Sequence, residues 1–459
     1  MVKVVVKISV NIFLILALFS FSLFAQNKHT VLWNVGEYML DFRDGSLKVP
    51  FEKHDWNPQK SRWYVDEMGN LKIIYDGQKL IHLLGNNSVP IVGGENIKED
   101  EVSFFIPVPA NKDMIYCIGE KTYSVIDLSE NKIIKTSSLK NTAQTHLAVR
   151  HFDKCSIWLI FFDKLEYYKY LITKDGIDYI ETVELEKNDY ENVKFYSSNI
   201  WRINLSKDCK HYTALVSGDR NNEIYYGDFD NKTGDFHRKY SYRFTQCTYN
   251  SNVIISPDNT KIIYHALMGE SSRGDDVFFS IPISVDGVPD FENSNVLFTI
   301  QRTRALYSIT DCFYAIDGNI YFLLYVLREI IKIGFDKPDI YKDVYNMPTI
   351  FYPRLSFVSD WFSDDYQENC IPYISYKEFC ESGKIMFSLD NYSQIKSFHW
   401  SFGDGTVSEE EFPVHVYKDL KKYDVTVETI SFDGQKNTFH KEIVVSPIII
   451  KAPKIICDD

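Results

Sequence analysis

A short pattern recurs along most of this chain: an apolar run, a polar turn, and a second apolar run. Its clearest copy spans residues 255–264, where Ser256-Pro257-Asp258-Asn259-Thr260 separates two isoleucine-rich runs. The other copies lie at 65–75, 108–116, 149–160, 205–210 and 314–322. Asp, Asn and Gly suit such turns because they tolerate positive φ and bond to their own backbone. Each copy therefore predicts a β-hairpin.

A second set of turns alternates with the first. These turns fall near Asp44-Gly45, Gly85-Asn86, Glu130-Asn131, Asp175-Gly176, Lys232-Thr233-Gly234, Asp286-Gly287 and Asp336-Lys337-Pro338. Successive turns are roughly 40 to 60 residues apart, which is the period of one four-stranded β-propeller blade. The pattern predicts an all-β fold with a propeller of about seven blades over residues 27–365. Six or eight blades, or a sandwich array without closure, are the alternatives.

The two sets of turns are unequal in number. The hairpin at Asp44-Gly45 has no first hairpin before it, so we expect strands from both ends of the propeller to share one blade. Residues 350–362 would supply the missing inner strands. Closure of the ring is favoured because an open array leaves sheet edges exposed. The high aromatic content, 15% with 31 Tyr and 32 Phe, also favours strands.

The last part of the chain carries a different signal. A polar, turn-forming cluster over residues 363–369 predicts a linker at 366–380. Short alternating runs follow over 381–446, which predicts an Ig-like β-sandwich. Within it, Trp400 and Phe402 share strand parity and should both face the core. Gly403 and Gly405 permit a tight turn, in which Asp404 can accept backbone N–H groups.

This series of motifs resembles the PKD domain. The residues that carry the resemblance are Trp400-Ser401-Phe402-Gly403-Asp404-Gly405, then Pro413, His415 and Tyr417, then Tyr423-Asp424-Val425-Thr426-Val427. Val427 departs mildly from the leucine usual at its position. The resemblance implies structural roles for Trp400, Phe402, Gly403, Asp404, Gly405, Pro413, His415, Tyr417 and Tyr423. A calcium site at Asp404 is the alternative, since some extracellular modules bind that ion weakly. Otherwise no cofactor or metal is expected.

The rest of the chain resembles exported Bacteroidetes propeller proteins that carry PKD domains and are associated with gliding motility or type IX secretion. The resemblance begins at Trp33-Asn34-Val35-Gly36-Glu37-Tyr38 and includes Gly69-Asn70-Leu71 and Ser256-Pro257-Asp258. It implies export and surface display, with no catalytic residues to carry over. That family usually ends in a sorting domain, and we do not expect one in this sequence. Residues 447–459 read as a tail or the truncated start of another domain.

The N-terminus predicts export independently. Lys3 and Lys7 precede an apolar run over residues 8–24, and Ala25-Gln26 is a plausible cleavage point, so residues 1–25 read as a signal peptide. An uncleaved membrane anchor is the alternative. No later stretch approaches the length of a transmembrane helix. We therefore expect a secreted, periplasmic or cell-surface protein without a transmembrane domain after cleavage.

Eight cysteines are irregularly spaced and suggest buried thiols rather than a zinc or redox site. Cys370 and Cys380, which flank the predicted domain junction, are the best disulfide candidates. The formal net charge of −13 disfavours nucleic acid as a partner. Lys418, Lys421 and Lys422 are too few to change that prediction.

The sequence contains no signature of a nucleophile elbow, zinc protease or P-loop. Asp275 and Asp276 could act as an acid–base pair, but we expect them to lie in a solvated loop. Arg273-Gly274-Asp275 matches an adhesion tripeptide that also recurs by chance. His399 is expected to face solvent, and His415 to be a structural residue.

We therefore expect a non-catalytic surface interaction or adhesion protein that binds a polysaccharide or another protein. The PKD-like domain would serve as a spacer or a second contact. The alternative is a propeller enzyme that cleaves glycans or peptides, which would need catalytic side chains converging at the channel mouth.

Overall fold

The computed structural model describes residues 32–346 and 372–445, apart from gaps of which the longest are 54–60, 185–201 and 302–309. The chain divides into two compact units. The first comprises residues 1–151 and 157–366, and the second comprises residues 152–156 and 367–459.

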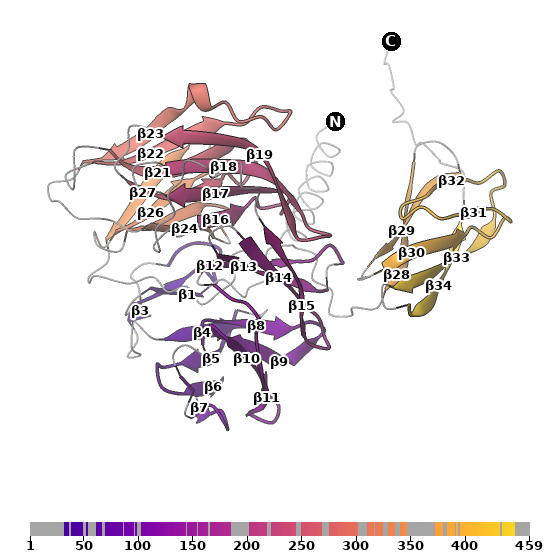
Figure 1. The fold of residues 1–459 in the computed structure, drawn as a ribbon, viewed down its shortest axis with the longest axis horizontal. Helices are drawn as coiled ribbons and strands as arrows, with labels where there is room; N and C mark the ends of the chain where they lie inside the picture. The colour runs from indigo at the N-terminus through magenta and orange to yellow at the C-terminus, as the bar shows by residue number, and fades with distance from the viewer. Residues whose placement is uncertain are drawn as a thin grey trace, which may run out of the picture. The chain divides into compact units, whose positions relative to one another are not determined.

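The first unit is built from seven successive antiparallel sheets (Figure 1). A single 3-10 helix, η4 (Phe291–Asn293), interrupts the described strands of this unit. The strands, sheet by sheet, are β1 (Leu32–Val35), β2 (Tyr38–Asp41) and β3 (Glu52–Lys53); β4 (Arg62–Val65), β5 (Leu71–Tyr75), β6 (Leu80–Leu84) and β7 (Asn87–Pro90); β8 (Phe104–Val108), β9 (Asn111–Ile118), β10 (Thr122–Asp127) and β11 (Lys132–Ser138); β12 (Thr145–Arg150), β13 (Ile157–Asp163), β14 (Glu166–Ile172) and β15 (Ile177–Glu184); β16 (Arg202–Leu205), β17 (His211–Ser217), β18 (Asn222–Asp230) and β19 (Asp235–Phe244); β20 (Tyr249–Ile255), β21 (Lys261–Met268), β22 (Asp275–Pro282) and β23 (Asn295–Ile300); β24 (Thr310–Tyr314), β25 (Ile320–Leu324), β26 (Glu329–Gly334) and β27 (Tyr341–Asn346).

Both sets of predicted turns fall between paired strands. The first set joins β4 to β5, β8 to β9, β12 to β13, β16 to β17, β20 to β21, and β24 to β25. The second set joins the last two strands of every sheet, from β2–β3 to β26–β27. The predicted succession of four-stranded units is therefore confirmed.

Burial within a sheet explains its sequence pattern. The second strand of the fourth sheet, β13, is buried at six successive positions, because neighbouring sheets cover both of its faces. The last strand, β15, is half-buried or exposed along its whole length. Inner strands are consequently continuous apolar runs, while outer strands carry charged residues such as Glu181 and Glu184.

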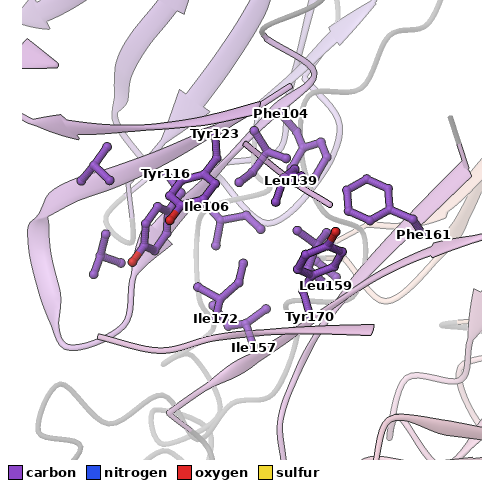
Figure 2. Close-up of a cluster of buried hydrophobic side chains, with 14 of the residues drawn as sticks. Phe104, Ile106, Tyr116, Tyr123, Leu139, Ile157, Leu159, Phe161, Tyr170 and Ile172 are labelled. Carbon is purple, nitrogen blue, oxygen red and sulfur yellow. The ribbon is translucent and has the colours of Figure 1, made fainter. Parts of the chain in front are cut away.

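Apolar clusters fill the interfaces between successive sheets. Figure 2 shows the cluster between the third and fourth sheets, where Phe104, Ile106 and Tyr116 face Leu159 and Tyr170. Equivalent clusters join the second sheet to the third, the fourth to the fifth, the fifth to the sixth, and the sixth to the seventh. Each sheet is thus held face to face by the next, as in propeller blades.

The ring closes between its first and last sheets. Leu40 and Phe42 at the end of β2 share one buried cluster with Tyr321, Leu323 and Ile330 of the seventh sheet. The rings of Phe42 and Tyr321 meet edge to face, with centroids 5.2 Å apart. Val65 of the second sheet belongs to the same cluster. The first sheet therefore packs between the seventh and the second, and the predicted closed ring of seven blades is confirmed.

The first sheet has three strands among the described residues, because β1 pairs antiparallel with β2 ahead of the Asp44-Gly45 turn. The expectation that no hairpin precedes this turn is therefore wrong, since the short β1 run over residues 32–35 was not recognised as a strand. The segment 350–362, expected to complete this blade, lies outside the described residues. So do the predicted signal peptide (1–25), the predicted Cys370–Cys380 disulfide and the tail 447–459, which stay predictions. The predicted linker 366–380 is wrong over its second half. Residues Tyr373–Glu378 form a strand of the second unit, because Ile374 packs in the core of that unit.

The second unit is a sandwich of two antiparallel sheets, ordered β28-β29-β32 and β31-β30-β33-β34. Its strands are β28 (Tyr373–Glu378), β29 (Lys384–Asp390), β30 (Ile395–Ser401), β31 (Val407–Ser408), β32 (Val414–Val416), β33 (Lys422–Ser431) and β34 (Lys436–Val444). The buried residues of β33 alternate with exposed or half-buried ones, because only one face of the strand meets the core. Trp400 and Phe402 both lie in that core, as their strand parity predicted.

Candidate functional site

The strand order gives the ring two different faces. In each four-stranded sheet, the turns between the first and second strands and between the third and fourth strands lie at one end, here called the turn face. The chain passes from one sheet to the next at the opposite end, here called the connection face. The passages include residues 54–61, 91–103, 185–201 and 301–309, which are longer than most connections at the turn face. First strands contact one another between the second and third sheets (β4 and β8) and among the last three four-stranded sheets (β16, β20 and β24), as expected for strands nearest the ring axis.

A polar network crosses these first strands in the last three sheets. The side-chain amide of Asn204 on β16 donates to the Val253 carbonyl of β20 at 2.7 Å and lies 3.2 Å from Asn252 Oδ1. It also approaches Cys312 Sγ on β24 at 3.9 Å. Asn252 is buried. One amide therefore bridges three successive blades, which fixes the spacing of their inner strands.

A buried histidine–carboxylate pair extends this network outward in the sixth sheet. His265 on β21 is the cross-strand partner of Asn252. Its Nε2 lies 2.6 Å from Asp276 Oδ1 on β22, and the two side chains are 1% and 0% exposed. Such a pair fixes the ring orientation of the histidine. Both side chains are closed to solvent, and the contact between them joins β21 to β22 within the sixth sheet.

Asp276 corrects a sequence prediction. We expected Asp275 and Asp276 to lie in a solvated loop, but both belong to β22, and Asp276 is completely buried. The strand begins two residues earlier than its apolar run Val277-Phe278-Phe279 suggested. Asp276 faces His265 rather than Asp275, so the predicted acid–base pair of neighbouring carboxylates does not form. Arg273 and Gly274 of the adhesion tripeptide lie outside the described residues.

A buried lysine clamps the fifth sheet onto the fourth. Lys169 on β14 is 2% exposed, and its Nζ lies 2.6 Å from Asp235 Oδ1 and 2.7 Å from Glu181 Oε1. It also donates to the Thr233 carbonyl at 3.0 Å. Burial acts to raise the pKa of Asp235, but hydrogen bonds from Lys169, Thr233 and Tyr167 outweigh it and hold that pKa below 3.8.

Two further side chains hold the same turn. Trp158 Nε1 donates to the Asn231 carbonyl at 2.9 Å, and His151 Nε2 lies 3.1 Å from the Lys232 carbonyl. With Lys169, they satisfy three successive carbonyls of the β18–β19 turn. The turn needs Gly234 (φ +75°), because a Cβ there would lie 3.0 Å from the Trp158 ring. These contacts hold the β18–β19 turn of the fifth sheet in one position against the fourth sheet.

The predicted motif in the sandwich forms one hydrogen-bonded turn. Gly403 has φ +77°, and a Cβ at this position would lie 2.6 Å from the Asp424 carbonyl oxygen. Gly405 also has positive φ, +92°, but has open space around it. Asp404 Oδ1 accepts the Thr406 N–H at 3.0 Å, as predicted for this turn. Burial acts to raise the pKa of Asp404, but bonds from Thr406 and His415 outweigh it and lower that pKa below 3.8.

The remaining motif residues close over this turn. His415 Nε2 lies 2.7 Å from Asp404 Oδ2, and its ring stacks on Phe402 with centroids 4.4 Å apart. The Tyr417 hydroxyl donates to the Phe402 carbonyl at 2.9 Å, and Tyr417 packs on Tyr423 at 4.1 Å.

The other predicted sandwich residues have structural contacts too. Pro413 is buried, and its carbonyl accepts the Phe387 N–H at 2.9 Å. His399 is exposed, as expected. The pairing of Asp404 with His415 was not predicted, and their separation of 11 residues gave no signal for it.

The described part of the chain shows the surroundings of four cysteines. Cys117, Cys155 and Cys312 are buried thiols, and Cys209 is a half-buried one. Within this part, no three His, Cys, Asp or Glu side chains are grouped so that they could hold a metal ion. Nor does it contain a helix long and apolar enough to cross a membrane.

Comparison with known proteins agrees with the geometry of the second unit. The family model of the PKD domain matches residues 378–446. These residues form a PKD domain. The match begins three residues before the predicted boundary and includes the Trp400–Tyr423 motif. The molecule is thus a β-propeller followed by a PKD β-sandwich. No curated protein sequence matches the chain.

Several solved structures are similar to parts of the chain. The PKD1 domain of the Vibrio cholerae metalloprotease PrtV is 26% identical, covers 17% of this chain and 98% of its own, with a TM-score of 0.15. A putative 6-phosphogluconolactonase from Bacteroides uniformis is 12% identical over 68% of this chain and 93% of its own, with a TM-score of 0.40. Kuenenia stuttgartiensis hydrazine synthase is 11% identical over 68% of this chain and 78% of its own, with a TM-score of 0.39.

Proposed function

We propose that this protein is an exported, non-catalytic surface protein whose propeller binds a polysaccharide or another protein. The PKD domain would act as a spacer or a second contact. The observation that supports the proposal best is the closed, clamped ring. Binding surfaces are commonly built on rigid scaffolds that position loops, and a ring held at every interface is such a scaffold.

The buried ionisable groups support a scaffold role as well. Lys169 is committed to Asp235 and Glu181, and His265 to Asp276. Each of these groups lies between strands or sheets and closes an interface there. These groups stabilise the ring itself, so we expect the ligand to bind at the loops of the turn face or the connection face.

The net charge limits the class of ligand. A formal charge of −13 repels polyanions, so nucleic acids and highly acidic glycans are disfavoured. We expect a neutral polysaccharide or a protein with a basic or apolar contact surface. Gliding motility and type IX secretion, which the sequence resemblance implies, are compatible settings and belong to the proposal.

A glycan array with the purified full chain tests the proposal. Binding without the appearance of new reducing ends supports a non-catalytic binding protein. New reducing ends would contradict it and favour the glycan-cleaving alternative. The variant Gly403→Ala, which perturbs only the PKD turn, assigns the site. Binding that survives this change lies in the propeller, and binding that is lost lies in the PKD domain.

Export is tested separately by mass spectrometry of the exported product. The proposal expects a chain that starts at Gln26, after removal of residues 1–25. A product that begins at Met1 and stays in the membrane fraction would show an uncleaved anchor instead.

A further inference from the structure

Strand β32 lies at an edge of one of the two sheets of the PKD domain and exposes apolar side chains. Among the described strands, β32 pairs only with β29, so one of its two edges has no partner there. The side chains of Val414 and Val416 are 48% and 55% exposed on this strand. Exposed edge strands offer unpaired backbone groups to another strand.

The register shows which backbone groups face the open edge. The Phe387 N–H bonds to the Pro413 carbonyl, and the Tyr417 N–H bonds to the Gly383 carbonyl, both at 2.9 Å. In an antiparallel ladder the bonded residues alternate. Residues 413, 415 and 417 therefore bond toward β29, while the N–H and C=O of Val414 and Val416 point toward the open edge.

Charges of opposite sign flank this strand. Exposed Glu409 and Glu410 lie just before it, whereas exposed Lys418 and Lys421 lie just after it. Asp419 is the one acid at the basic end, and it lies 3.9 Å from Lys421. Two strands of this kind placed antiparallel bring the acidic end of each beside the basic end of the other. A parallel arrangement would bring like charges together.

We propose that β32 is a homodimerisation edge, which pairs antiparallel with β32 of a second copy of this chain. A two-fold axis at His415 would set Val414 opposite Val416 of the other copy. Both valines already direct their backbone groups outward, so the two strands can exchange hydrogen bonds in both directions. Their exposed side chains would pack together on the outer face.

Such an interface is isologous, which limits it to two copies. Each copy uses the same edge, so the contact closes on itself and cannot propagate into a fibre through β32. The strand has only three residues, and Pro413 directly precedes it. The interface is therefore small, and we expect association that depends strongly on protein concentration and weakens with added salt.

Sedimentation equilibrium of the purified full chain measures this association. We expect a reversible monomer–dimer equilibrium that Val416→Lys weakens about tenfold or more, since a lysine on an edge strand opposes strand addition. Val407→Lys is the matched control, because Val407 is 59% exposed on the edge of the other sheet. It should leave the dissociation constant unchanged. Thermal unfolding of both variants confirms that the sandwich remains folded.

A charge exchange gives the sharper result. The variant Glu409→Lys/Glu410→Lys and the variant Lys418→Glu/Lys421→Glu should each be monomeric alone, because each repels its own copy. Mixed together, they should form a heterodimer. The proposal is overturned if the wild-type chain stays monomeric, if Val416→Lys dimerises as well as the wild type, or if the mixed variants do not associate. A monomeric chain that captures an extended peptide at β32 would also overturn it.

Discussion

Gly403 occupies the most restrictive position in the PKD turn. Its φ is +77°, and a Cβ would lie 2.6 Å from the Asp424 carbonyl oxygen, so both strain and a clash oppose any side chain. We expect Gly403→Ala to lower the free energy of unfolding of the sandwich by about 2 kcal/mol or more. Gly405→Ala is the control, with positive φ but open space, and should cost about 1 kcal/mol. Chemical denaturation would contradict this explanation if the two losses were equal.

Asp404 should make the PKD domain sensitive to acid. Its pKa in the folded protein is lower than 3.8 because Thr406 and His415 together outweigh the effect of burial. A depressed pKa contributes stability that is complete above the unfolded value and is lost as the pH falls through the folded value. We therefore expect Asp404→Asn to flatten the loss of stability below about pH 4. In a carbon-13 titration, a carboxyl midpoint at or above 3.8 would disprove the shift.

Single residues were predictable where local chemistry decides their place. The burial of Trp400 and Phe402 followed from strand parity, and the hydrogen bond of Asp404 followed from turn geometry. Asp276 was not predictable in this way. Its burial depends on His265, which lies on the neighbouring strand, and two adjacent aspartates read locally as a loop.

The β18–β19 turn shows how one element can fix the packing of two sheets. Lys169 is 2% exposed and bonds to Asp235, whose side chain is 32% exposed. Removing one partner of such a pair leaves the other without compensation. We expect Lys169→Met to lower the free energy of unfolding of the propeller by about 3 kcal/mol. Lys174→Met is the control, since Lys174 is 65% exposed and 3.8 Å from Asp175.

The control should change stability by less than about 0.5 kcal/mol. Urea denaturation of both variants makes the comparison. Equal effects of the two substitutions would show that the clamp contributes no more than a surface ion pair does.

At the scale of elements, hairpins were the most predictable feature. Turn residues such as Asn259 and Gly318 adopt positive φ values, of 58° and 77°. Asparagine tolerates this conformation, and glycine adopts it readily because it has no side chain. The clamps between sheets were not predictable. Lys169 and Asp235 are 66 residues apart, and nothing in a local pattern identifies that contact.

The whole molecule consists of two compact units with separate cores. Multidomain proteins commonly unfold in more than one step. We expect two transitions in differential scanning calorimetry, and we expect Gly403→Ala to shift only one of them. A single transition that moves as a whole in this variant would show that the units unfold cooperatively.

Closure of the ring was predicted from an imbalance in the turns and from the cost of exposed sheet edges, with no pair of residues identified that would meet across it. The structure supplies one, because Phe42 and Tyr321 are both buried and meet with centroids 5.2 Å apart across the first and seventh sheets. Their separation in sequence means that only a closed ring brings them together. The contact therefore tests the architecture more directly than any contact between successive sheets.

The decisive measurement is a double-mutant cycle with Phe42→Leu and Tyr321→Leu, followed by chemical denaturation. Tyr321 also donates to Asp317, but that loss occurs in both arms of the cycle and cancels. A closed ring predicts a coupling energy of about 0.5–1.5 kcal/mol between the two aromatic side chains. A coupling energy of zero within error would mean that the first and seventh sheets do not meet, and the propeller would be refuted.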